Sequence, residues 1–390
     1  MIDRITIEWR FVEGVPILEP GHLYLVARSE GQTDGEGVVI SGGPSLPVGE
    51  GGNPITGEYG FLEINESLGA GSSLSSSIDR YDPDDTEASR GALDITDVLL
   101  ENNNVSLDDI WSLMVELANN IDSQEFRYDP TLGAPPIGSG LNSNSLITSV
   151  LSQVGVNIED VRPTGNILPG DQTLLSGSGD DFLRGFDNSD VFFNAGGGND
   201  IFHGGDGEVL QRSITSDGID TVFYDGVDNV SINTAPDLTS WNVEQRLGGE
   251  EFLDTLFSIE AFGSRNFSIL NEVNLENNDQ GVRLDDQEGS EAQQLISSVG
   301  NDIVDTVTID LGAEQSALFG NFGSFIGTQF SDEFVLNSFF GRSFDGNGGL
   351  DTVDYSGFQS SLGLTVDLDC STNASALVRI ERETASVHQI

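Results

Sequence analysis

A short repeat of glycines, an aspartate and one large apolar residue constrains this chain more than any other feature of its sequence. It occurs three times between Ser176 and His203, as SGSGDDFLR, GFDNSDVFF and AGGGNDIFH, with Asn194 as one extra residue. The aspartates share one register, and an apolar residue follows each two places later: Asp181, Asp190 and Asp200, then Leu183, Phe192 and Phe202. A flexible Gly/Asp linker would need no apolar residue at every ninth place, so the period predicts a stacked repeat structure.

A second, less regular block of the same repeat lies between Gly327 and Gly357. GTQFSDEFV and GNGGLDTVD carry Asp332 and Asp351, each again followed by an apolar residue two places later. Phe344 keeps the apolar phase between them, but Arg342 stands where an aspartate is expected. We therefore expect this block to be a degenerate copy of the first.

The pattern has a direct physical interpretation. Glycines permit the positive φ angles of a tight turn, the aspartate closes the turn, and a three-residue strand follows whose middle side chain points inward. Two units make one coil, so Asp181 and Asp200 should line one edge and Asp190 the other. Val209 is the next-coil equivalent of Asp190, so we expect that second edge to use Asp206 or backbone oxygens.

These residues resemble the repeats of RTX (hemolysin-type) calcium-binding proteins. The resemblance implies a parallel β-roll with Ca²⁺ between turns two repeats apart, and export by type I secretion without a cleaved N-terminal signal. The N-terminus has no apolar signal core, which agrees with such a route. The resemblance assigns these positions to calcium: Gly177, Gly179, Asp181, Asp190, Gly196, Gly198, Asp200, Gly205, Asp206, Asp332, Gly346, Gly348 and Asp351.

Charge narrows the possible partners. The chain has 65 Asp and Glu against 15 basic residues, all of them Arg, which gives a formal net charge of −50. This charge argues against nucleic acid and anionic membranes as partners, because their phosphates and anionic headgroups would be repelled, and it favours hard cations, which bind oxygen ligands. Cys370 is the only cysteine, which excludes an intrachain disulfide and a cysteine zinc site. No apolar run approaches the ~18 residues of a membrane span.

Residues 1–165 carry no repeat and predict an α+β domain. The segments 21–29 and 37–44 indicate a strand pair, and Ser106 with Asp109 marks a helix start. A second helix should begin near Asn142 or Asn144 and end at Gly155. We expect a multidomain chain in which this α+β domain precedes β-rich parts: a β-roll at 166–226, a spacer at 227–326, and the degenerate block with its tail at 327–390.

The order of two motifs in this domain resembles circularly permuted papain-like (NlpC/P60, LRAT-like) enzymes: a strand histidine, His22, followed by N-S-N-S-L at a helix start, residues 142–146. The resemblance gives His22 the base position and Ser143 the nucleophile position. Serine stands where those enzymes carry cysteine, and an alcohol gains far less than a thiol from a helix N-terminus. Asp129 or Glu63 could orient the base. Alternatively, Ser143 is only a helix cap and His22 an inert strand residue.

Three functions remain open from the sequence. The first, which we favour, is a secreted calcium-binding protein whose N-terminal domain binds an extracellular partner or is structural. The second is a secreted hydrolase or acyltransferase of peptidase, amidase or acyl-ester type that uses Ser143 and His22. The third is an extracellular surface or matrix adhesin, although no serial adhesion repeats are present.

Overall fold

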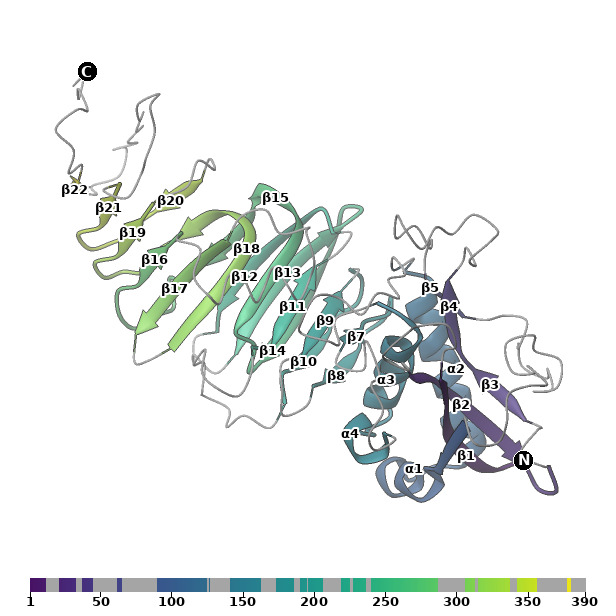
Figure 1. The fold of residues 1–390 in the computed structure, drawn as a ribbon. Coiled ribbons are helices and arrows are strands. Elements are labelled where there is room, and N and C mark those ends of the chain that lie inside the picture. The colour runs from purple at the N-terminus through teal and green to yellow at the C-terminus, as the bar shows by residue number, and fades with distance from the viewer. Residues whose placement is uncertain are drawn as a thin grey trace. The chain divides into compact units, whose positions relative to one another are not determined.

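A computed structural model gives the fold of the chain (Figure 1). Two compact units are present: Met1–Phe186 with Asp190–Phe202, and Asp187–Ser189 with His203–Ile390. The structure describes residues 1–11, 21–32, 37–44, 62–64, 90–124, 126, 141–162, 173–185, 190–194, 196–205, 219–224, 227–235, 240–286, 306–312, 315–336, 342–355 and 377–379.

The first unit begins with an antiparallel sheet in the order β3-β2-β1-β6. Its strands are β1 (Ile2–Phe11), β2 (Gly21–Ser29), β3 (Val38–Ile40) and β6 (Arg90–Asp94), and a separate pair is formed by β4 (Gly42–Pro44) and β5 (Leu62–Ile64). Ile5 and Ile7 are fully buried, as expected for alternate residues that share one face of a strand. The predicted pairing between 21–29 and 37–44 is confirmed, because Val26 lies opposite Val39.

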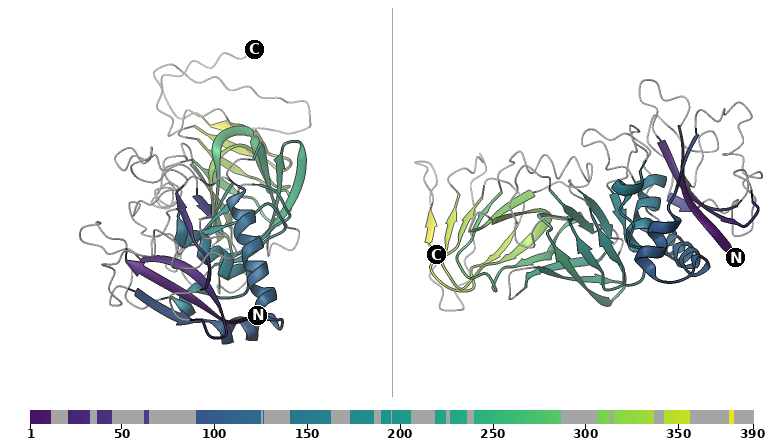
Figure 2. Two further views of the ribbon diagram at one scale, coloured as in Figure 1. Left: turned by 90° about the vertical axis from the view of Figure 1, so that its right-hand side faces the viewer. Right: turned by 90° about the horizontal axis from the view of Figure 1, so that it is seen from below.

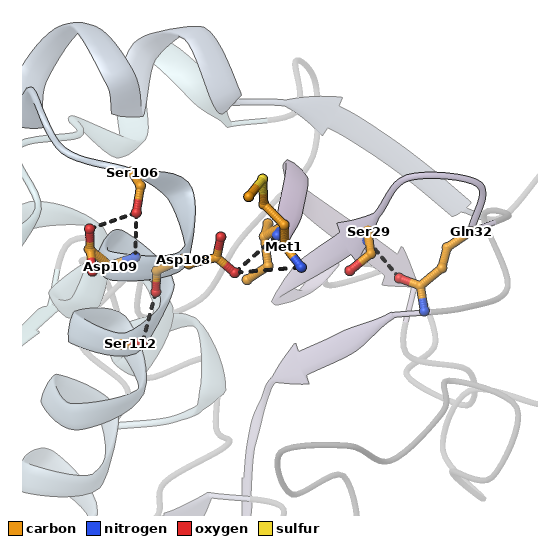
Figure 3. A network of polar contacts seen from close by, with 8 residues as sticks. Met1, Ser29, Gln32, Ser106, Asp108, Asp109 and Ser112 are labelled. Carbon is orange, nitrogen blue, oxygen red and sulfur yellow. Dashed lines mark hydrogen bonds and ion pairs between the residues drawn. The ribbon is translucent and has the colours of Figure 1, made fainter.

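In the described residues four helices follow: α1 (Thr96–Asn103), α2 (Leu107–Asp122), α3 (Ser143–Gln153) and α4 (Ile158–Val161). Helices α1 and α2 contact β1, and α3 contacts β2, so the helices lie alongside the sheet (Figure 2). The predicted helix start is confirmed, since the Ser106 side chain accepts a hydrogen bond from the Asp109 amide. Asp108 in the first turn of α2 accepts a hydrogen bond from the Ile2 amide at 3.0 Å, which ties α2 to β1 (Figure 3).

The same compact unit includes the short strands of the first repeat block. They are β7 (Thr173–Leu175), β8 (Phe182–Arg184), β9 (Val191–Asn194) and β10 (Ile201–His203). Strand β7 is parallel to β9 in the register Leu174 to Phe192, and β8 is hydrogen-bonded to β10. The expected inward residues, Leu183, Phe192 and Phe202, are fully buried, and the rings of the two phenylalanines meet at 5.6 Å. We call these two strand pairs the first ladders.

The second unit begins with a region of longer strands. These are β11 (Thr221–Tyr224), β12 (Asn229–Thr234), β13 (Trp241–Leu247), β14 (Glu250–Phe257) and β15 (Ala261–Asn274). Strands β12, β13 and β14 form an antiparallel meander. Strand β15 has three partners: its first residues are parallel to β11, its last residues are parallel to β12, and both of its ends are parallel to β18 (Gln315–Ile326).

The rest of the second unit contains a second set of parallel ladders. Its strands are β16 (Arg283–Asp285), β17 (Thr306–Gly312), β18 (Gln315–Ile326), β19 (Glu333–Val335), β20 (Ser343–Asp345), β21 (Thr352–Asp354) and β22 (Leu377–Arg379). Strands β16, β19, β21 and β22 are successively parallel, and β18 is parallel to β20. Phe344 packs on Phe325 and Phe334, as its place in the apolar phase predicts. Strand β16 was not predicted, because it precedes the second repeat block, and yet it starts this ladder.

Candidate functional site

The turns before β8 and β10, residues 177–181 and 196–200, form the first acidic turn pair. Asp200 Oδ1 accepts a hydrogen bond from the Asp181 amide at 2.9 Å, so the two aspartates, 19 residues apart, meet on one edge. Asp181 Oδ2 accepts a hydrogen bond from the Gly177 amide within its own turn. Asp181 is 6% exposed and Asp200 is 1% exposed. The predicted register of these two aspartates is therefore confirmed, and both carboxylates face the backbone.

Asn194 is part of this turn pair, although the sequence suggested only an extra residue. Its Nδ2 donates to Asp200 Oδ2 at 3.1 Å, and its Oδ1 accepts from the Gly196 amide at 2.7 Å. The side chain therefore bridges the start and the end of one turn. Its position two residues before a glycine, where an Asn side chain can close a local turn, was the signal available in the sequence.

Glycine is required in the first acidic turn pair where the chain reverses and two turns touch. Gly196, Gly197 and Gly198 have φ angles of 88°, 106° and 82°, a left-handed region that other L residues avoid. A methyl group on Gly198 would lie 2.1 Å from the Gly179 carbonyl oxygen, whereas one on Gly179 would meet nothing within 4 Å. Carbonyl oxygens of one turn thus approach the backbone of the next.

The second acidic turn pair, residues 327–332 and 346–351, repeats this arrangement. Asp351 Oδ1 accepts a hydrogen bond from the Asp332 amide at 3.1 Å, again across 19 residues. Asp332 in turn accepts from the Thr328 amide at 2.7 Å and from the Val282 amide at 2.8 Å. Gly346 is also required by space, because a methyl group there would lie 2.0 Å from Asp351 Oδ2.

The positions between the paired turns differ in the two blocks. Asp190 is fully buried, whereas Asp206 and Val209 lie outside the described residues. In the second block, Arg342 Nη1 forms an ion pair with Asp286 Oδ2 at 2.7 Å, and both side chains are almost completely buried. A guanidinium therefore supplies positive charge at the position where the phase predicts a carboxylate. Its partner Asp286 was not predicted, since it follows the unrecognised strand β16.

The remaining predicted turn glycines take various backbone conformations. Gly205 has a φ of 121° and its amide donates to His203 Nδ1 at 3.1 Å. Gly348 donates to the Thr328 carbonyl at 3.1 Å, which links the turns of the second pair, and the adjacent Gly349 has a φ of 91°. Gly177 packs closely on helix α2, where a methyl group would lie 2.8 Å from Asn120 Cβ.

A hydrogen bond from a backbone amide to a carboxylate on a neighbouring strand also occurs outside the two blocks, where the sequence did not predict it. Glu260 Oε2 accepts a hydrogen bond from the Asp220 amide at 3.0 Å, and Glu260 is 6% exposed. Both residues immediately precede strands that pair in parallel, β11 and β15. The only signal was the acid before each strand, because no glycine repeat leads into Glu260.

Burial makes the charged form of these carboxyl groups less favourable. Desolvation raises the pKa of Asp181 to about 6, against the opposing effect of the Gly177 amide and with a further contribution from the nearby Asp180 charge. Desolvation also raises the pKa of Asp351, and the charges of Asp332 and Asp345 add to that shift. A bound cation would offset both effects.

The oxygen atoms of the first acidic turn pair are of the kinds that bind calcium. The Ser178 and Gly179 carbonyls approach the following turn at Gly197 and Gly198, and the same two turns carry the carboxylates of Asp181 and Asp200. Ca²⁺ takes oxygen ligands of both kinds. The described residues contain no group of three or more His, Cys, Asp and Glu that could hold a metal, so a site here would need the backbone carbonyls.

For the second candidate site, His22 and Ser143, the structure gives the backbone positions. His22 lies in β2 opposite Arg10, and Ser143 is the first residue of α3. The alternative in which Ser143 caps the helix is wrong, because the cap is Asn142, whose side chain accepts from the Asn144 amide. The side chains of His22, Ser143 and Glu63, and all of Asp129, lie outside the described part of the chain.

Neighbours of the two candidate catalytic residues are in direct contact. The Leu23 amide donates to Asn144 Oδ1 at 2.8 Å, and both residues are buried. Each is the next residue after His22 or Ser143, so the edge of β2 meets the first turn of α3. The structure thus brings together the two chain segments that the resemblance singled out.

No family model, curated protein or solved structure matches this chain. Among the described residues, no helix combines the length and apolar character needed to cross a membrane. Function therefore has to be argued from the residues of the acidic turns and of the β2–α3 contact.

Proposed function

We propose that this chain is a secreted calcium-binding protein of the RTX type. Ca²⁺ would bind between stacked acidic turns and drive the folding of the ladders after export by type I secretion. One observation carries the proposal: in both blocks the carboxylate of one turn accepts a hydrogen bond from the aspartate amide 19 residues earlier. This contact aligns carboxylates and turn carbonyls along one edge.

Calcium would add binding energy to ladders that have little to stabilise them. Strands β8, β9 and β10 contribute only three or four residues each, which limits the apolar surface that they can bury. A ligand that binds only the folded form stabilises it by mass action. Extracellular modules bind Ca²⁺ at roughly 10⁻⁴–10⁻³ M, so we expect an unfolded repeat region in the calcium-poor cytosol and a folded one outside.

Circular dichroism of the full chain tests this proposal. The spectrum is recorded in EGTA, after addition of millimolar Ca²⁺, and after Mg²⁺ at the same ionic strength. We expect β-structure to be gained with Ca²⁺ and not with Mg²⁺, which keeps its waters and prefers strict octahedral sites. Identical spectra in EGTA and Ca²⁺ would refute calcium-driven folding.

In this proposal the N-terminal residues bind a partner or serve a structural role, and a Ser/His hydrolase is the second candidate. The Leu23–Asn144 hydrogen bond favours the second candidate, since it brings the predicted base and nucleophile segments together. Against it stands the chemistry of Ser143: a helix N-terminus contributes about 1 kcal/mol to an anion, far too little to ionise an alcohol.

Covalent labelling decides between these roles. A serine-directed acylating probe and a thiol-directed probe are applied to wild type, Ser143→Cys and Ser112→Cys, the last being an exposed helix position that controls for ordinary thiol reactivity. We expect wild type to remain unlabelled and Ser143→Cys to react faster than Ser112→Cys. Labelling of wild type at Ser143 that is lost in His22→Ala would establish a serine hydrolase instead.

A further inference from the structure

Two serine hydroxyls of α3 form hydrogen bonds with the edges of the first ladders, one with β7 and the other with β8. Ser149 Oγ accepts a hydrogen bond from the Leu175 amide of β7 at 2.7 Å. Ser152 Oγ accepts from the Arg184 amide of β8 at 3.0 Å and donates to the carbonyl of the same residue at 3.1 Å. Exposed strand edges offer unpaired amides and carbonyls, and here a helix satisfies them.

Burial makes these contacts structurally significant. Ser149 is 0% exposed and Ser152 is 7% exposed, and the neighbouring Val150 and Leu151 are fully buried. Helix α3 contacts β7 and β8 as well as β2. A buried amide that loses its partner pays the full cost of desolvation, so the helix and the strand edges depend on each other for stability.

The opposite end of α3 holds the N-terminal sheet. Asn144 Oδ1 accepts the Leu23 amide of β2 through the buried contact described above. An 11-residue helix is about 16 Å long, so one rigid element connects β2 to the ladder edges. The hydrogen-bonding side chains at both ends are almost completely buried.

We infer that α3 couples calcium binding at the first acidic turn pair to the order of the β2–α3 junction. The inference rests on the proposed calcium function and extends it to regulation of the N-terminal domain. Calcium would stabilise the first ladders, the ladders would hold Ser149 and Ser152, and the helix would hold the edge of β2. Two sites that bias one shared element are linked thermodynamically.

Hydrogen exchange of the full chain with and without Ca²⁺ tests the coupling. Three segments are followed: the ladders at 173–203, helix 143–153, and strand 21–29. We expect Ca²⁺ to slow exchange in all three. Slowing confined to the ladders would overturn the coupling while leaving calcium-driven folding intact. If no segment responds, the proposed calcium function fails and the coupling fails with it.

Variants at the helix cap give a second readout. Ser152→Ala should keep calcium binding at the ladders but raise the exchange rates of strand 21–29 in Ca²⁺ by about fivefold, the effect of one typical hydrogen bond. Ser152→Thr keeps the hydroxyl and should restore slow exchange. Ser112→Ala, at an exposed position of α2, is the control, since the Ser112 hydroxyl donates a hydrogen bond to a carbonyl of its own helix. Equal rates in Ser152→Ala and Ser112→Ala would contradict the coupling.

Discussion

The two repeat blocks share one hydrogen-bond pattern but differ in the residue at the middle position of the repeat phase. In the first block the phase carries three carboxylates, Asp181, Asp190 and Asp200, all buried. In the second block the middle position is Arg342, paired with the buried Asp286. The comparison indicates that the repeat sets the turn geometry, whereas the charge balance of an edge depends on residues elsewhere. At this middle position the second block carries a positive charge and the first carries a carboxylate.

Removal of the internal cation should have the largest effect. Arg342→Ala leaves Asp286 buried without its ion-pair partner, and loss of one partner of a buried pair costs about 3–5 kcal/mol of unfolding free energy. Arg283→Ala is the matched control, because its pair with Glu333 is half-exposed and is worth about 0–1 kcal/mol. Urea unfolding in Ca²⁺ measures both. Equal destabilisation by Arg342→Ala and Arg283→Ala would mean that the buried ion pair stabilises the second block no more than the half-exposed one.

Turn stacking is tested next, by adding one methyl group. Gly198→Ala places a β-carbon against the Gly179 carbonyl and forces an L residue into the left-handed region, which alone costs about 1–2 kcal/mol. Overpacking adds about 1–3 kcal/mol. Gly179→Ala, with open space and an ordinary φ, should cost well under 1 kcal/mol. Similar melting temperatures for the two variants would show that the turns do not stack as described.

Calcium affinity separates the carboxylates that face the turns from those on the surface. Asp181→Asn removes one negative charge beside the turn carbonyls and should weaken the tightest calcium site about tenfold. Asp160→Asn, an exposed residue of α4, makes the same charge change and should leave affinity nearly unaltered. Isothermal titration calorimetry compares them. An equal loss in both variants would mean that net charge, and not this turn, determines binding.

A smaller effect is expected from pH in the absence of calcium. Burial raises the pKa of Asp181 from 3.8 to about 6, so the folded state holds this proton more tightly than the unfolded state. The resulting stability is full below pH about 4 and is lost as pH rises through about 6. In calcium-free buffer, where we expect the ladders to be mostly unfolded, the residual folded fraction of wild type should therefore fall relative to that of Asp181→Asn between pH 4 and 7. A constant difference over that range would argue against the raised pKa.

The sequence predicted those parts of the structure that depend on neighbours in the chain. The nine-residue period indicated the short strands and the inward positions of Leu183, Phe192 and Phe202, because turn glycines and strand residues act locally. Capping chemistry likewise located the start of α2 at Ser106. The Asp181–Asp200 contact was also predictable, since a regular coil length fixes which residues stack.

Contacts between distant segments were not predictable in the same way. Strand β16 starts the second ladder, in which Arg283 pairs with Glu333, 50 residues later. The repeat could not be recognised at β16, because Val282 occupies the position that an aspartate holds in the other units. The sequence analysis assigned no role to Ser149 and Ser152, yet their hydroxyls hydrogen-bond to strand edges. Polar residues on a helix do not reveal from sequence whether water or another backbone satisfies them.

The central claim is that calcium binding and folding are linked through the acidic turns. Thermal unfolding of the full chain in increasing Ca²⁺, at constant ionic strength, measures this linkage directly. We expect a midpoint that rises steadily with calcium concentration, with about 2.7 kcal/mol of stabilisation at one hundred times the dissociation constant. The linkage would be contradicted by a midpoint that is the same in EGTA and in about 10 mM Ca²⁺, a concentration roughly ten times the weakest dissociation constant typical of extracellular modules.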